Sequence, residues 1–246
     1  MKNPNLPVLF LLCWGAAFSP ALAGPASSAW AVAELFTSQG CSSCPPAERW
    51  LGTRGLELFQ QGRLLPLSFH VDYWNALGWA DPFSSPAFTR RQRDYARALG
   101  LAGLYTPQMV VSGRTAFLGS DGSRALRKIG DPANAVPRLS LSLRPSRDPG
   151  KIRLAVHPFP RDGSKVWVLI FENGLVTRVP RGENRGRRLT EDFVVRQLRE
   201  IKAPLGEISF PRKVPNLRSN LGLAVLVQDP SSLEIRAAGA LFPLER

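Results

Sequence analysis

Short apolar runs separated by turn residues dominate the first half of the chain and predict alternating strands and helices. The run at residues 30–36 predicts a first strand, and the run at 64–71 predicts a second. A helix is predicted at about 45–54, because two prolines at its start suit a first helical turn. A second helix is predicted at 86–99, where Ser85 is in position to cap the first turn.

The hydrophobic pattern at residues 105–118 predicts a hairpin of two short strands joined by a turn at Ser112–Gly113. The order of elements is therefore strand, helix, strand, helix and hairpin. A parallel βαβ unit followed by a ββ hairpin is the order of the thioredoxin fold. We therefore predict an α/β thioredoxin-like domain over residues 24–136, with residues 121–137 as the connection to the rest of the chain.

The remainder of the chain has several short alternating runs separated by turn residues. This pattern predicts a smaller β-rich, sandwich-like domain over residues 137–246. One helix is predicted within it, with Thr190 as its cap. Val194, Leu198 and Ile201 would share the buried face of that helix.

The N-terminus has the pattern of a secretory signal peptide over residues 1–23. Lys2 supplies the positive end, residues 8–18 supply an apolar core, and Ala21-Leu22-Ala23 supplies a cleavage site after Ala23. No later apolar run reaches the length of a membrane span. We therefore expect a periplasmic or secreted protein that does not span the membrane.

The chain is strongly basic, with 32 Lys and Arg against 19 Asp and Glu and a formal net charge of +13. The positive residues are dispersed, and we find no nucleic-acid-binding motif, so no nucleic-acid partner is expected. We interpret the loop at 181–189 as an exposed connection rather than an anion clamp. A solvated helix face is predicted for Arg90, Arg91, Arg93 and Arg97.

The clearest chemical signal is the pair Cys41 and Cys44, which are separated by two serines and followed by two prolines. The remaining cysteine, Cys13, lies in the predicted signal peptide. A CxxC pair between a strand and a helix is typical of a redox motif, since the helix dipole stabilises a thiolate. We expect Cys41 to be the nucleophile and Cys44 to resolve the mixed disulfide. The alternative is a structural disulfide, although a loop this short would contribute only about 2 kcal/mol.

Other residues are candidates because of their position relative to this pair. Thr106 and Pro107 precede the hairpin, where thioredoxin-like folds place a cis-proline loop that binds substrate beside the cysteines. Glu34 either relays protons to the second cysteine from a buried position or points to solvent. Trp74 and Trp79 either contact substrate or belong to a small satellite core.

His70, at the end of the second strand, is the basis of an alternative prediction, a metal site. Together with Cys41 and Cys44 it could bind a soft ion such as Cu(I), although a histidine at a strand end is more often structural. We therefore predict no metal and no cofactor. A thioredoxin-like binding module and an envelope protein with an inert disulfide also remain as alternatives.

Three stretches carry a resemblance to a known family. The sequence resembles an exported bacterial thioredoxin-like family catalogued as a domain of unknown function (1223), through residues 34–48, 70–88 with 105–113, and 181–190. The resemblance implies a thioredoxin-like domain with a β-rich appendage, and the matching positions are Cys41, Cys44 and Pro107. We predict a periplasmic thiol–disulfide oxidoreductase acting on a protein or small thiol or disulfide substrate.

Overall fold

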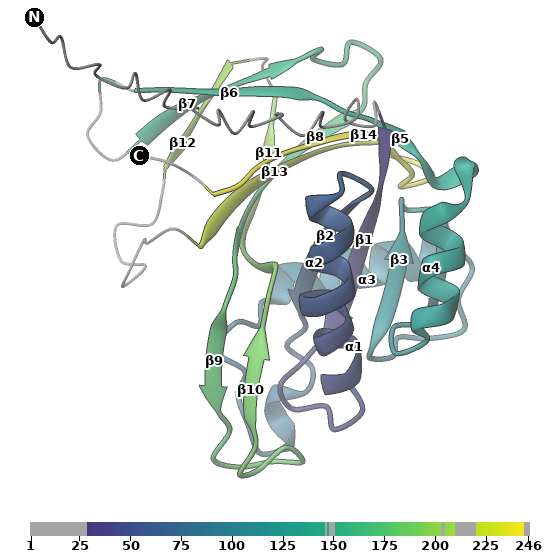
Figure 1. Cartoon of the computed structure of the whole chain (residues 1–246), viewed down its shortest axis with the longest axis vertical. Coiled ribbons are helices and arrows are strands. Elements are labelled where there is room, and N and C mark those ends of the chain that lie inside the picture. The colour runs from purple at the N-terminus through teal and green to yellow at the C-terminus, as the bar shows by residue number, and fades with distance from the viewer. Residues whose placement is uncertain (1–28, 146, 148–150, 203–204, 210–219, 244–246) are drawn as a thin grey trace, which may run out of the picture.

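A large mixed β-sheet runs through the whole protein, with helices on both of its faces (Figure 1). This computed structural model describes residues 29–145, 147, 151–202, 205–209 and 220–243. The predicted signal peptide, residues 1–23, lies outside the described residues. No helix in the described part of the chain is both long enough and apolar enough to cross a membrane.

Four strands of the first half form one end of this sheet, as the apolar runs predicted. They are β1 (Ala29–Thr37), β2 (Leu64–His70), β3 (Gln108–Val111) and β4 (Thr115–Leu118). β1 and β2 are parallel, whereas β3 is antiparallel to both β1 and β4. Every residue of β2 is buried, which explains its mostly apolar sequence.

The predicted helices also form where expected. α1 (Pro45–Trp50) continues through a π-helical turn (Leu51–Gly55) into α2 (Leu56–Gln60), and α3 is Pro86–Ala98. The Ser85 hydroxyl accepts a hydrogen bond from the Ala87 amide at 3.2 Å and caps α3. Figure 1 shows α1 and α2 in front of the sheet and α3 behind it.

One helix was missed. The segment expected to be a connection contains α4 (Gly122–Gly130), which packs on β1 and β3 on the same side as α1 (Figure 1). The helix is short and buries two side chains, Ala125 and Ile129, one turn apart. The Asp121 carboxylate caps it by accepting the Arg124 amide hydrogen bond at 2.9 Å.

Four strands from the second half extend the same sheet, namely β8 (Lys165–Glu172), β11 (Val194–Ile201), β13 (Leu221–Gln228) and β14 (Ile235–Leu241). The nine-stranded sheet has the order β14-β13-β8-β11-β2-β1-β3-β4, and β5 pairs with β1. The position of the predicted boundary, 136/137, falls within β5 (Val136–Pro137).

The remaining elements are the short 3₁₀ helices Asn75–Leu77 and Pro132–Asn134, with strands β6 (Ser140–Pro145), β7 (Lys151–His157), β9 (Leu175–Arg178), β10 (Arg188–Glu191) and β12 (Leu205–Ser209).

A separate three-stranded sheet, β12-β7-β6, covers one face of β8 and β13. Leu154 and Val156 of β7 pack in one apolar cluster with alternate residues of β8, including Val168 and Ile170. Leu169, on the opposite face of β8, belongs to the main core together with the residues of β1 and β2. Both faces of β8 are therefore covered, which accounts for its continuous apolar sequence.

The helix predicted after Thr190 is wrong, because this segment forms strands β10 and β11. A register shift between Val195 and Gln197 interrupts the ladder between β11 and β8. The residues expected on one helical face lie on both faces of the strand: Leu198 pairs with Leu169 and packs in the main core, whereas Ile201 pairs with Val166 and packs in the other apolar cluster. Pairing with β8 along the strand satisfies its backbone and outweighs the local helix signals.

The prediction of a solvated arginine face on α3 is wrong for Arg91. This side chain is only 7% exposed and forms a two-pronged ion pair with the buried Glu34 of β1, with distances of 2.5 and 3.0 Å. The Tyr95 hydroxyl also donates to Glu34, at 2.5 Å. Arg91 therefore ties α3 to the rear face of the central sheet.

We predict that Arg91→Met lowers the free energy of unfolding by about 3–5 kcal/mol, because it leaves the Glu34 carboxylate buried without its cation. Urea unfolding measures the change. The matched control is Arg93→Met on the exposed face of the same helix, which should change stability by less than about 0.5 kcal/mol. Equal effects of the two substitutions would contradict a structural role for the ion pair.

Candidate functional site

Cys41 and Cys44 form a disulfide at the start of α1, with a Cα–Cα distance of 5.4 Å. Cys44 is the N-cap residue of the helix, and Pro45 follows at its first position. Both cysteines are 0% exposed, whereas the intervening serines are exposed. The Cys41 sulfur lies 3.4 Å from the Ser43 hydroxyl, so of the two sulfurs it is the one in contact with an exposed residue.

The loop before β3 lies directly beside this disulfide. The Thr106–Pro107 peptide bond is cis, as predicted. The Ser43 hydroxyl donates to the Thr106 carbonyl at 3.5 Å, and the Trp74 indole donates to the Thr106 hydroxyl at 2.9 Å. The predicted residues Thr106, Pro107 and Trp74 therefore come together around the cysteines.

The second predicted tryptophan, Trp79, is connected to the cysteine segment through Gln39. Its indole donates to the Gln39 side-chain oxygen at 3.0 Å. Gln39 is fully buried and stands two residues before Cys41. Trp79 therefore contacts the segment just before the cysteines.

A projecting hairpin contacts the backbone of the cysteine segment. We define the hairpin arm as residues 175–191, comprising β9, β10 and their connecting loop, which extends beside α1 in Figure 1. The Asn184 side-chain amide donates to the carbonyls of Gln39 and Cys41, both at 2.9 Å. Glu183 accepts the Ser42 amide hydrogen bond at 3.0 Å.

The loop of the hairpin arm is therefore not simply the exposed connection that its sequence indicated. Its arginines are exposed, but Asn184 is fully buried. Gly182 has φ 75°, and a Cβ atom at this position would lie 3.1 Å from the Trp79 Cβ. Glycine thus permits both the left-handed backbone and the close approach of the loop to Trp79.

A buried polar group lies deeper, centred on His70 at the end of β2. The His70 Nδ1 atom is 2.7 Å from the Asp81 carboxylate, and both side chains are fully buried. Asp81 also accepts backbone hydrogen bonds from Gln39 at 2.8 Å and Phe83 at 2.9 Å. These bonds fix the position of the carboxylate and, through it, the orientation of the imidazole ring.

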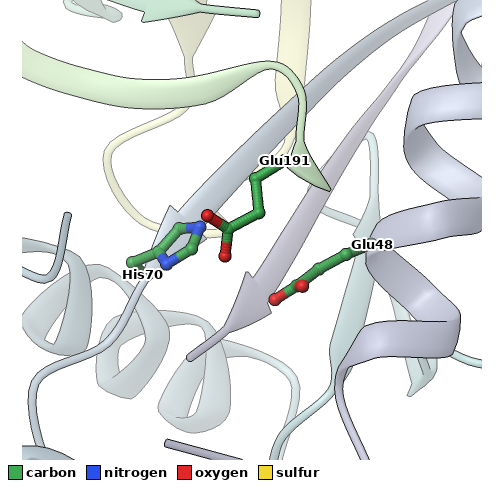
Figure 2. Close-up of side chains that lie close together, drawn as sticks. All are labelled: Glu48, His70 and Glu191. Carbon is green, nitrogen blue, oxygen red and sulfur yellow. The ribbon is translucent and has the colours of Figure 1, made fainter. Parts of the chain in front are cut away.

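Two glutamates complete this group, as Figure 2 shows. Glu48 of α1 accepts the Thr37 hydroxyl hydrogen bond at 2.5 Å, and Glu191 of β10 accepts the Gln39 side-chain amide at 2.7 Å. The ligand atoms of Glu48, His70 and Glu191 all lie within 4.8 Å of one another. We call these three residues the His–Glu–Glu cluster.

Burial and mutual interaction shift the titration of these groups. Burial raises the pKa of Glu191 to about 8, an effect that the His70 charge opposes and Glu48 reinforces. Desolvation also raises the pKa of Glu48. Burial by itself lowers the pKa of His70, but Asp81, together with Glu191 and Glu48, more than compensates and raises it to about 9. The pKa of Asp81 is lowered, because the His70 charge and the hydrogen bonds to Asp81 outweigh its desolvation.

Glu34 is buried, which was one of its two predicted positions, but its carboxylate is bound by Arg91 and Tyr95 of α3. Glu34 and Thr37 point to opposite faces of β1, and Thr37 faces α1 through its bond to Glu48. The acid on the face that carries the disulfide helix is therefore Glu48 rather than Glu34.

Comparison with known proteins identifies the family. Residues 32–228 match the family described as Protein of unknown function (DUF1223). The chain belongs to this family. None of the curated proteins matches it significantly.

Two solved structures resemble this DUF1223 protein. A crystal structure of a protein from Agrobacterium tumefaciens shares 30% sequence identity, and the match covers 88% of this chain and 95% of that chain, with a TM-score of 0.60. HBP35 of Porphyromonas gingivalis shares 15% identity over 89% of this chain and 79% of its own, with a TM-score of 0.59. At that identity the second similarity concerns the fold alone.

Sequence reasoning missed several residues of this DUF1223 site. Glu48 had a usable signal, because it follows Cys44 by four residues and so lies on the same face of α1. Asp81 and Glu191 had none, since each is an ordinary acidic residue in a segment predicted as loop or helix. Asn184 was overlooked among the arginines of its loop.

We predict that Asn184→Ala loosens the hairpin arm and speeds reduction of the Cys41–Cys44 disulfide by dithiothreitol about tenfold. Two buried hydrogen bonds are lost, each contributing about 0.5–1.5 kcal/mol, and 1.4 kcal/mol corresponds to a factor of ten. Thiol alkylation followed by mass spectrometry measures the rate. Arg185→Ala, an exposed change in the same loop, is the control and should leave the rate unchanged. An unaltered rate for Asn184→Ala would mean that the hairpin arm does not limit access.

Proposed function

We propose that this protein is a thiol–disulfide oxidoreductase that exchanges disulfides through Cys41 and Cys44. The observation that carries the proposal is the disulfide at the start of α1, whose intervening residue Ser43 contacts the Thr106–Pro107 loop. A disulfide closing only two intervening residues contributes little to stability, about 2 kcal/mol, in a protein with a large buried core. Its position at a helix start instead favours thiolate chemistry.

The arrangement of the first half supports a thioredoxin-like domain as the setting for this chemistry. The strand order β2-β1-β3-β4, with β1 and β2 parallel and β3 antiparallel to β1, follows the element order that the sequence predicted. α1 and α4 lie on one face of these strands and α3 lies on the other (Figure 1). Under this proposal, the second half is an appendage that supplies the hairpin arm.

Exchange with a substrate disulfide would proceed in two steps. The Cys41 thiolate attacks one substrate sulfur, forms a mixed disulfide and releases the other substrate sulfur as a thiolate. The Cys44 thiolate then attacks the Cys41 sulfur, which restores the Cys41–Cys44 disulfide and releases the second substrate thiolate. Two electrons pass to the substrate, and the reverse sequence oxidises a substrate dithiol.

The contacts of the two cysteines support this division of roles. The Cys41 sulfur touches the exposed Ser43, whereas Cys44 is the N-cap of α1 and continues directly into the buried helix face. The Thr106 carbonyl, next to Pro107, accepts a hydrogen bond from the same Ser43, and the Trp74 indole donates to the Thr106 hydroxyl. A protein or small thiol or disulfide substrate would therefore approach Cys41 along the Thr106–Pro107 loop.

Export fits the same chemistry. The pattern of residues 1–23, with cleavage after Ala23, indicates a periplasmic or secreted location. Disulfides form and persist in such oxidising compartments. The mature chain would then contain the Cys41–Cys44 pair and no further thiol.

We predict that Cys44→Ser accumulates mixed disulfides with substrate, because Cys41 can still attack but the resolving thiol is missing. Cys41→Ser should trap far fewer and should abolish the reduction of insulin disulfides. Non-reducing electrophoresis with mass spectrometry measures the trapped species, and the double variant Cys41→Ser/Cys44→Ser gives the background. Equal trapping by the two single variants would contradict the assignment of Cys41 as the nucleophile.

The competing Cu(I)-carrier function predicts a different result. The reduced protein would bind one Cu(I) tightly and show no disulfide exchange. In the structure His70 is engaged by Asp81, and the compact group of ligand atoms around it contains two glutamates and no cysteine. This environment favours exchange over copper delivery, because Cu(I) prefers thiolate and thioether ligands.

A further inference from the structure

We propose that the His–Glu–Glu cluster of Glu48, His70 and Glu191 is a binding site for a divalent transition-metal ion, with Zn²⁺ as the best-matched ion. The three residues come from α1, β2 and β10 and converge from different directions (Figure 2). Their ligand atoms lie within 4.8 Å of one another, and all three side chains are buried. The site is separate from the cysteines and does not depend on the proposed redox function.

Two buried polar atoms of this cluster lack a partner. His70 Nε2 and Glu191 Oε1 have no hydrogen-bond partner among the described residues, and the two residues are 0% and 1% exposed. An unsatisfied buried polar atom destabilises the folded protein, because it has lost its hydrogen bonds to water. A single cation between the three side chains would satisfy both atoms at once.

The surroundings of His70 prepare its Nε2 atom to bind a metal. With Nδ1–H donating to Asp81 at 2.7 Å, Nε2 is the ring nitrogen left for a metal ion, which would displace any proton bound there. Asp81 is held in turn by the backbone amides of Gln39 and Phe83. A carboxylate that orients a histidine in this way is the usual outer shell of a protein metal site.

Each glutamate carboxylate likewise accepts one side-chain hydrogen bond, which leaves lone pairs that can bind an ion. Glu48 accepts from Thr37 and Glu191 accepts from Gln39, while a carboxylate offers about four lone-pair sites. The terminal torsion of a glutamate is soft, so each carboxylate can turn toward a shared ion. In a metal-bound site each ligand atom would lie about 2.0–2.2 Å from the ion. The ligand atoms of the three side chains would therefore have to move slightly closer together.

The donor set selects the class of ion. One imidazole and two carboxylates suit Zn²⁺ and neighbouring divalent metals, whereas the absence of a thiolate from the set disfavours Cu(I). A divalent cation between the two buried carboxylates would displace the protons that burial favours on them and would neutralise their charge. Three protein ligands also leave a coordination position for a water molecule.

The test uses the oxidised full-length mature protein, in which the disulfide offers no thiolate. After treatment with a chelator and its removal, the protein is titrated with Zn²⁺ in competition with a chromophoric chelator. We expect one Zn²⁺ per chain. Glu191→Gln and Glu48→Gln, which preserve side-chain shape, should each weaken binding by at least about 100-fold, and Asp81→Asn, a change in the outer shell, by about 10–100-fold.

Two controls separate this site from other sources of zinc binding. Glu57→Gln removes an exposed carboxylate from α2 and should leave the affinity unchanged. Cys41→Ser/Cys44→Ser should also retain one Zn²⁺, because no thiol is a ligand. Circular dichroism of each variant establishes that it is folded, and Co²⁺ bound to the site should lack a thiolate charge-transfer band.

Three results would overturn the proposal. The first is the absence of stoichiometric Zn²⁺ binding by the folded wild-type protein. The second is binding that survives both Glu191→Gln and Glu48→Gln in folded variants. The third is binding that disappears in the double cysteine variant, which would assign the ion to the thiols.

Discussion

The pairing of β2 with β11 is the interaction on which the rest of the structure depends. The Ser68 amide donates to the Phe193 carbonyl at 2.8 Å, and Val194 pairs with Ser68 in parallel register. This contact joins the strands of the first half to those of the second half in one sheet. Phe193 is fully buried and packs against Phe59 and Phe171, so an apolar core anchors the junction.

The same junction determines where the hairpin arm lies. Phe193 has φ 55°, an unusual left-handed conformation, at the point where β10 gives way to β11. From there the hairpin arm extends beside α1, with Glu191 at its base near His70 and Asn184 in its loop on the cysteine segment. The pairing of β2 with β11 thereby places the hairpin arm against the site formed by residues of the first half.

Gln39 connects the parts of this site to one another. Its backbone amide donates to Asp81, and its side-chain amide donates to Thr177 and Glu191. Its backbone carbonyl accepts from Asn184. Because Cys41 follows two residues later, the disulfide, the His–Glu–Glu cluster and the hairpin arm share one hydrogen-bonded residue. Displacing the hairpin arm would therefore disturb the polar group as well as uncover the sulfurs, and an ion bound there would hold the base of the hairpin arm in place.

The sequence by itself determined the local elements of the first half. Apolar runs gave β1 and β2 because both strands are buried on both faces, and Ser85 with Pro86 marked the start of α3. It also identified Cys41, Cys44, Thr106, Pro107 and Trp74, which the structure brings together, because motif spacing and element order are local properties of the chain. Local signals misled at β11, where apolar residues at helical spacing lie on both faces of a strand, and α4 was missed although Asp121 caps it.

Only the tertiary structure decided the partners of the polar residues. Glu34 and Glu48 look equivalent in the sequence, yet the pleat of β1 directs Glu34 to Arg91 while Glu48 faces His70. Glu191 reaches the cluster from 121 positions beyond His70 along the chain, and Asn184 reaches Cys41 across a sequence separation of 143. Such contacts depend on strand pairing between distant segments, and no local pattern of hydrophobic and polar residues records which strands pair.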